Sequence, residues 1–156
     1  MTELSEAMAA TSASQYIQVH SWAIPSIQCV HILALAVLFS SALMVDLRVL
    51  GTGLKSQTLQ VVAARFVPPI WACLAVLLIS GGALILAEPG RTISNPVFYT
   101  KMILLAAAII VTLWLSAFAK GSRPTAALQV VLALVSLLLW AAIIVAGRYI
   151  AYVESY

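Results

Sequence analysis

Four apolar runs constrain what this chain can fold into more than any other feature of its sequence. They cover residues 23–45, 66–87, 98–119 and 125–147. Each is close to the ~20 residues that a helix needs to cross the hydrocarbon core of a bilayer. Only the third run contains a charged residue, Lys101. The pattern predicts four membrane-spanning helices.

The composition agrees with this prediction. Hydrophobic residues make up 63% of the chain and charged residues only 8%, whereas a soluble domain has about 25% charged residues. Lipid must therefore surround most of the surface. Because the connections between the runs are short, neighbouring helices are expected to be antiparallel. We predict an all-α integral membrane four-helix bundle, with residues 1–156 forming one domain.

The segment before the first run is expected to form a short helix on the membrane surface. Its first 20 residues contain two glutamates and no lysine or arginine, which is unlike a cleavable signal peptide. Its apolar residues would lie on the lipid side of an interfacial helix: Leu4, Met8, Tyr16, Ile17 and Val19.

Proline positions indicate where the spanning helices begin. Pro25 is expected in the first turn of the first helix, and Pro68 and Pro69 in the first turn of the second, where a missing N–H costs little. Asn95 followed by Pro96 is typical of an N-cap and a first helical position. The third helix is therefore expected to begin at this pair.

The distribution of basic residues predicts the orientation. One side of the membrane would have 3 + 2 = 5 of them and the other side 3: Arg48, Lys55, Arg65, Lys120 and Arg123 against Arg91, Lys101 and Arg148. Basic residues in short loops favour the cytoplasm, so both termini are expected in the periplasm of a bacterial inner membrane. The basic residues are too scattered to indicate nucleic-acid binding.

The two cysteines are predicted to be free. Cys29 would lie near the outer end of the first helix and Cys73 nearer the cytoplasmic end of the second. At ~1.5 Å per residue, their depths differ by more than ~10 Å. A disulfide needs Cα atoms within ~7 Å.

His31 is the main candidate functional residue. It lies in the hydrocarbon, about 10 Å below the outer boundary, where ionisable side chains are rare and mark functional sites. The topology brings several polar residues to a similar level: Gln28, Glu88, Lys101 and Arg148. Two interpretations are open at this point. Either His31 makes one interhelical hydrogen bond while Lys101 and Arg148 extend to the headgroups, or the cluster binds a cofactor.

Haem b is the cofactor that this cluster would suit. It needs a neutral imidazole on the iron, an apolar slot and cations for two propionates. His31 would be the metal ligand, Lys101 and Arg148 the propionate partners, with Gln28 nearby and the Gly/Ala patches forming the slot. The other histidine, His20, is expected at the surface. A second axial ligand would then be absent, or would come from a lysine, a methionine or another protomer of a homo-oligomer.

Asp46 and Arg48, two residues apart, point away from each other on a helix. We expect Asp46 to pair with Arg65 or Lys120 and to fasten the bundle at the cytoplasmic boundary.

Several segments resemble a family of uncharacterised bacterial four-helix membrane proteins. They are W-x-x-P-S-I-Q-x-V-H-I-L-A-L-A, V-D-L-R-V-L-G, P-P-I-W and N-P-V-F-Y-T-K-M, which begin at Trp22, Val45, Pro68 and Asn95. The resemblance covers nearly the whole chain and implies the four-helix architecture.

Two better-known groups are more distantly similar. His31, Arg48 and Lys101 match positions in the haem-containing bacterial protoporphyrinogen oxidase, although its further histidine in the lysine-bearing helix is missing. CopD-type copper-resistance membrane proteins also have a first-helix histidine. A copper site would need converging soft ligands, and Met44, Met102 and the two cysteines are scattered in depth.

Three functions are therefore open. The first is a haem-b-binding membrane protein with a redox or electron-transfer role. The second is a cofactor-free accessory or structural subunit of a membrane complex, and the third is copper handling. Whether the chain is an enzyme is left open.

Overall fold

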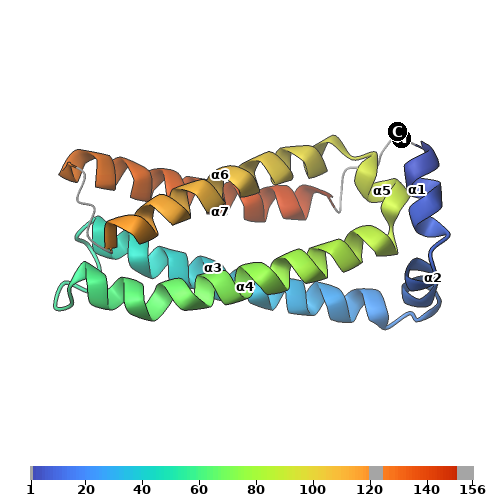
Figure 1. Ribbon diagram of the computed structural model, residues 1–156, viewed down its shortest axis with the longest axis horizontal. Helices are drawn as coiled ribbons and strands as arrows, with labels where there is room; N and C mark the ends of the chain where they lie inside the picture. Colours follow the sequence, from blue (N-terminus) through green and yellow to red (C-terminus); the bar gives the residue numbers. More distant parts are fainter. Residues whose placement is uncertain (1, 120–124, 151–156) are drawn as a thin grey trace.

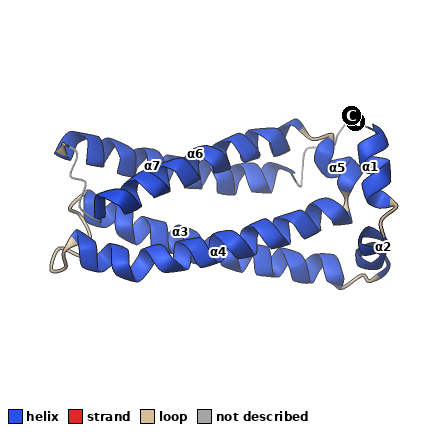
Figure 2. Ribbon diagram, viewed as in Figure 1, coloured by secondary structure: helices blue, strands red, loops and turns tan. Residues whose placement is uncertain are grey.

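The computed structural model describes residues 2–119 and 125–150, and in these ranges the chain is helical with no strand (Figure 2). Four long helices are α3 (Ala23–Val49), α4 (Leu59–Ala87), α6 (Pro96–Ala119) and α7 (Ala126–Ile150). Three short ones are α1 (Thr2–Ala9), α2 (Ser12–Val19) and α5 (Pro89–Ile93). Each long helix is apolar and long enough to cross a membrane. The all-α four-helix membrane architecture is confirmed, and the chain is a multi-pass membrane protein.

The predicted helix starts are confirmed for α3 and α6. Pro25 lies in the first turn of α3. The backbone N–H of Val97 donates to Asn95 Oδ1 at 2.9 Å, so Asn95 caps α6, which begins at Pro96. Both signals act within a few residues of the helix end.

The predicted start of α4 is wrong. The helix begins at Leu59, with Thr58 as its N-cap, so Pro68 and Pro69 lie inside it. Thr58 Oγ1 accepts a hydrogen bond from the backbone N–H of Val61. The cap starts the helix before the apolar run begins, because hydrophobicity indicates only the part of a helix that lies in lipid.

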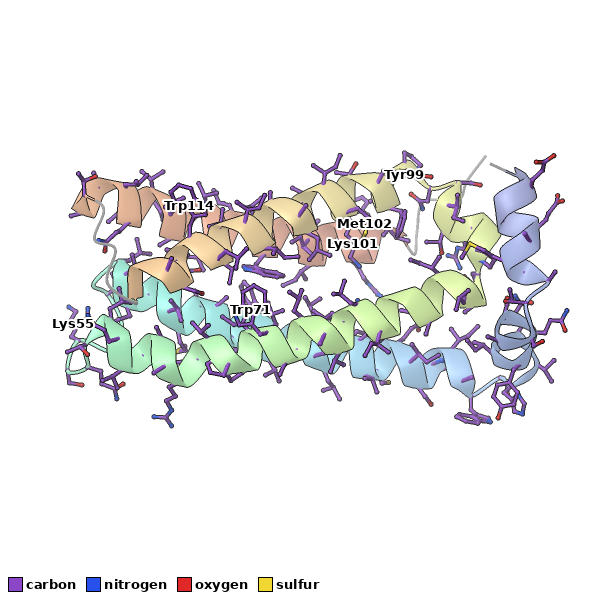
Figure 3. All side chains as sticks on the ribbon, in the orientation of Figure 1. Lys55, Trp71, Tyr99, Lys101, Met102 and Trp114 are labelled. Atoms are coloured by element: carbon purple, nitrogen blue, oxygen red, sulfur yellow. The ribbon has the colours of Figure 1, made fainter. Side chains whose placement is uncertain are left out.

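The long helices form two antiparallel hairpins that lie side by side (Figure 1). The most extensive contacts are between α3 and α4 and between α6 and α7, while α3 on α7 joins the hairpins and α4 scarcely meets α6. A core cluster at the centre of the bundle contains Ala34, Leu38, Ala42, Ile70, Leu74, Leu77, Ala108, Trp140 and Ile143. Figure 3 shows Trp71 extending from α4 toward the α6–α7 hairpin, and it packs against this cluster.

The N-terminal segment forms two helices, where one was expected. They lie across the end of the bundle beside α5 (Figure 1), which we call the capped end; the opposite end, with residues 50–58, is the loop end. The side of α2 that meets α4 is polar. The fully buried Ser14 donates to the carbonyl of Leu86 at 2.7 Å, and Gln18 donates to that of Ala87 at 2.9 Å.

These bonds attach the polar side of α2 to the end of α4. The last carbonyls of a helix have no partner within the helix, and Ser14 and Gln18 satisfy two of them at the end of α4. Tyr16 and Val19 are consequently turned outward, 60% and 79% exposed. The side chain of Leu4 is outside the described part.

Cys29 and Cys73 are free, as predicted. Cys29 is exposed on α3, whereas Cys73 is half-buried and packs against the core cluster. We expect alkylation of the denatured, non-reduced protein to modify both thiols, as measured by mass spectrometry. In the folded protein in detergent, a small maleimide should modify Cys29 faster than Cys73. A disulfide-linked peptide, or equal rates, would contradict this placement.

Candidate functional site

His31 lies one turn beyond the core cluster, toward the capped end, and contacts α4. Its Nδ1 is 2.8 Å from Ser80 Oγ. Ser80 Oγ is also 2.7 Å from the carbonyl oxygen of Val76, to which it donates. A hydroxyl has one proton, so Ser80 must accept the hydrogen bond from the Nδ1–H of His31. The network thus assigns the tautomer in which the lone pair is on Nε2.

Gly81 lets the imidazole lie directly against the backbone of α4. A Cβ atom at this position would be 3.4 Å from His31 Cε1, whereas one at Gly82 would meet nothing within 4 Å. At Gly81 the imidazole itself lies against the small-residue patch of α4 that was expected to form an apolar slot. Ser80 and Gly81 together fix the position of the ring.

Lys101 approaches His31 from the other hairpin. Figure 3 shows its side chain extending from α6 toward α3 and α4. Its ammonium nitrogen would be 3.6 Å from a Cβ at Gly147 on α7, and its charge acts on His31. Glu88 was expected in this cluster, but it is exposed and pairs with Arg91 at 3.2 Å. That is the single ion pair within residues 2–119 and 125–150, so Lys101 has no carboxylate partner there.

The structure does not bring every predicted site residue into this cluster. Gln28 and Arg148 are exposed, although both lie near the capped end on α3 and α7. His20 is at the surface, as predicted: its Nδ1 is 2.9 Å from the carbonyl oxygen of Tyr16. Its ring centroid is 4.3 Å from that of Tyr16 and 6.0 Å from that of Trp22. The cluster therefore consists of His31, Ser80 and Lys101.

A second polar group, which the sequence analysis missed, lies on the opposite side of the core cluster. Asp46, Thr112 and Ser136 come from α3, α6 and α7 and are 1%, 6% and 2% exposed. They line a cavity of about 10 Å³. The carboxyl of Asp46 hydrogen-bonds the side chain of Ser136. Asp46 Oδ2 and Thr112 Oγ1 are buried without a hydrogen-bond partner among the described residues.

The predicted ion pair between Asp46 and Arg65 is wrong. Arg65 is exposed, with its guanidinium 5.8 Å from the centroid of the Phe66 ring, and Lys120 is outside the described residues. The missed signal was the four-residue spacing of Ala34, Leu38, Ala42 and Asp46. Positions four apart share one helix face, which places Asp46 on the face that meets the other helices.

A site for a bare metal ion is not evident in the described residues. They contain no group of three or more histidine, cysteine, aspartate or glutamate side chains placed to hold one. A single imidazole is sufficient for a metal ion whose other ligands are supplied mainly by a cofactor.

The family model described as "Family of unknown function (DUF6644)" matches residues 7–153. The chain belongs to this family. Comparison of this DUF6644 member with curated proteins and with solved structures gives no significant match. Because membership of DUF6644 transfers no activity, function must be argued from the two polar groups.

Proposed function

We propose that this chain is a haem-b-binding membrane protein in which His31 is an axial ligand. The observation that supports the proposal most is the hydrogen bond from His31 Nδ1 to Ser80, because it leaves Nε2 as the nitrogen with a free lone pair. Histidine ligands characteristically donate their other N–H to a second group, which fixes the tautomer and the ring orientation. Ser80 does this for His31, and the ring also lies against Gly81.

Lys101 provides the second argument. Its ammonium is close enough to act electrostatically on His31 and has no carboxylate partner in the described part of the chain, and a cation partly removed from water favours an anionic partner. A haem propionate would be one. Arg148, which follows Gly147 at the exposed end of α7, would meet the other at the headgroup level, and Gln28 would border the site. Residues for the ligand and the propionates thus fit haem b.

When bound, haem b supplies one-electron transfer. The protein's own contribution is to hold a neutral imidazole by Ser80 and to keep Lys101 next to it. Because one chain provides one membrane-embedded histidine, a second ligand to the haem would have to come from Lys101, from a methionine such as Met102, or from a second copy in a homo-oligomer. The electron-transfer partner would then be another membrane component.

The proposed location is a bacterial inner membrane with both termini in the periplasm. Arg48, Lys55 and Arg65 belong to the loop end of the bundle. Basic residues in short loops favour the cytoplasmic side, so the capped end, with His31 and Lys101, would be periplasmic.

The optical spectrum of the protein purified in mild detergent tests this function. We expect a Soret band and sharp α and β bands on reduction. His31→Ala should abolish haem incorporation, because the iron loses its buried nitrogen ligand, while the control His20→Ala should retain it. Haem content is measured by the pyridine haemochromogen assay.

Lys101 variants separate its two possible roles. Lys101→Arg keeps the cation but cannot ligate as a neutral amine, so an unchanged spectrum indicates propionate pairing and a high-spin shift indicates ligation. The proposal is wrong if the wild type takes up no haem on reconstitution, or if His31→Ala keeps its full content. Stoichiometric copper in a colourless protein would indicate copper handling instead, and no cofactor at all an accessory subunit.

A further inference from the structure

The cavity beside Asp46 presents two unsatisfied oxygen atoms to one small space. Asp46 Oδ2 and Thr112 Oγ1 are both buried without a partner among the described residues, and both residues line the cavity. The volume of about 10 Å³ is close to what a single water-sized occupant needs. Buried polar atoms in native proteins nearly always have a partner. The site is therefore built for one small occupant.

The charge of Asp46 limits what that occupant is. No cationic side chain among the described residues lines the cavity, and the only ion pair in the described ranges is between Arg91 and Glu88. An ionised carboxylate removed from water without a counter-charge costs several kcal/mol. The occupant that satisfies an ionised Asp46 together with the two open oxygens is a small cation, whereas a protonated Asp46 needs only a water.

The chemistry of the lining indicates the class of cation. The polar groups are one carboxylate and the hydroxyls of Thr112, Ser116 and Ser136, with no nitrogen or sulfur ligand. Oxygen-only sites suit hard cations and not copper or zinc. A single carboxylate balances a single positive charge, whereas sites for hard divalent ions use more carboxylates or water.

The cavity lies near the loop end of the bundle and between the two hairpins. Asp46 lies three residues before the end of α3 at Val49, which corresponds to ~4.5 Å along the helix axis. Ser116 continues the polar lining one turn beyond Thr112 toward the same loop end. Because Asp46 belongs to one hairpin and Thr112 and Ser136 to the other, an ion held here joins the two hairpins.

We propose that the Asp46–Thr112–Ser136 cavity binds one dehydrated monovalent alkali cation, with Na⁺ as the probe, from the loop end of the bundle. The ion is bound by Asp46 Oδ2 and Thr112 Oγ1, with the hydroxyls of Ser136 and Ser116 completing the shell. The site is on the opposite side of the core cluster from His31, so its occupancy is independent of the proposed haem function.

Thermal unfolding of the detergent-purified chain tests this site. Chloride salts of Na⁺, K⁺ and N-methyl-D-glucamine are compared at equal ionic strength, about 150 mM. We expect Na⁺ to raise the Tm by at least about 3 °C over N-methyl-D-glucamine, because a ligand specific for the folded state stabilises it. A K⁺ response of the same size also supports an alkali-cation site.

Three variants test whether the effect of Na⁺ on the Tm comes from this cavity. Asp46→Asn removes the charge and Thr112→Val one ligand at similar shape, so both should lose the Na⁺ response. Ser40→Ala is the matched control, because Ser40 is an exposed α3 hydroxyl that donates to the carbonyl of Ala36 at 2.8 Å. It should keep the response. If Asp46→Asn does not fold, Thr112→Val decides.

Equilibrium binding of ²²Na⁺ provides a direct readout. We expect one ion per wild-type and Ser40→Ala chain and a loss in Thr112→Val. Equal Tm values in all three salts, together with no bound ²²Na⁺, would overturn the proposal and indicate a buried water beside a protonated Asp46.

Discussion

Leucine in place of Gly81 is expected to displace the imidazole of His31. A Cβ at this position would already be 3.4 Å from His31 Cε1 and 4.0 Å from its Nδ1, so a branched side chain there competes with the ring for space. Overpacking of this kind costs about 1–3 kcal/mol. Loss of the Ser80 hydrogen bond should weaken haem binding by roughly 10- to 100-fold, the range seen when outer-shell partners of metal ligands are removed.

Gly82→Leu is the matched control for this variant. Its Cβ would meet nothing within 4 Å, and leucine is a better helix former than glycine by up to about 1 kcal/mol. Stability should therefore stay equal or rise, with haem content unchanged. Denaturant titration in detergent and the haemochromogen assay measure both quantities. Identical behaviour of the two leucine variants would show that the imidazole does not lie on α4 at Gly81.

The second large effect is expected at the centre of the bundle. Trp140 is 1% exposed and belongs to the core cluster. Trp140→Ala should lower the free energy of unfolding by about 3–5 kcal/mol, because a large cavity replaces its packing contacts. In lipid these contacts, and not transfer from water, hold helices together. SDS titration followed by circular dichroism provides the measurement.

Two further variants show how much of this loss of stability comes from buried packing and how much from the indole N–H. Trp114, on α6, is 55% exposed, so Trp114→Ala should cost less than about 1 kcal/mol. Trp140→Phe keeps most of the ring but removes Nε1, which is buried without a partner in the described residues. Because an unsatisfied buried donor costs about 1–3 kcal/mol, its removal should offset much of the lost volume. A loss as large as that of Trp140→Ala would contradict this balance.

Features that depend on a few adjacent residues were predictable from the sequence. The start of α6 is determined by Asn95 and Pro96, which act within one turn. The four spans follow from hydrophobicity, because lipid requires an apolar surface. The start of α4 was not predictable from its apolar run, since Thr58 begins the helix in a region that hydrophobicity does not describe.

Contacts between helices were harder to predict from the sequence. The depth of His31 correctly indicated a partner on another element, but its identity as Ser80 depends on how α3 and α4 are rotated about their axes. Asp46 was assigned an ionic partner because charge is visible in a sequence, whereas the cavity that it lines is formed by α3, α4, α6 and α7 together. The polar capping role of Ser14 and Gln18 likewise needs the end of α4 to be in place.

The two-hairpin arrangement has a consequence for how the molecule assembles. Contacts within each hairpin exceed those between them, so each hairpin can insert into the bilayer as a unit before the two dock, in the order expected when helices form first and associate afterwards. His31 and Asp46 come from one hairpin, while Lys101 and Thr112 come from the other. His31 and Ser80 can meet within one hairpin, but neither polar group is complete until the hairpins dock. Occupancy of the Asp46 cavity, which needs both hairpins, would therefore report the final step of folding.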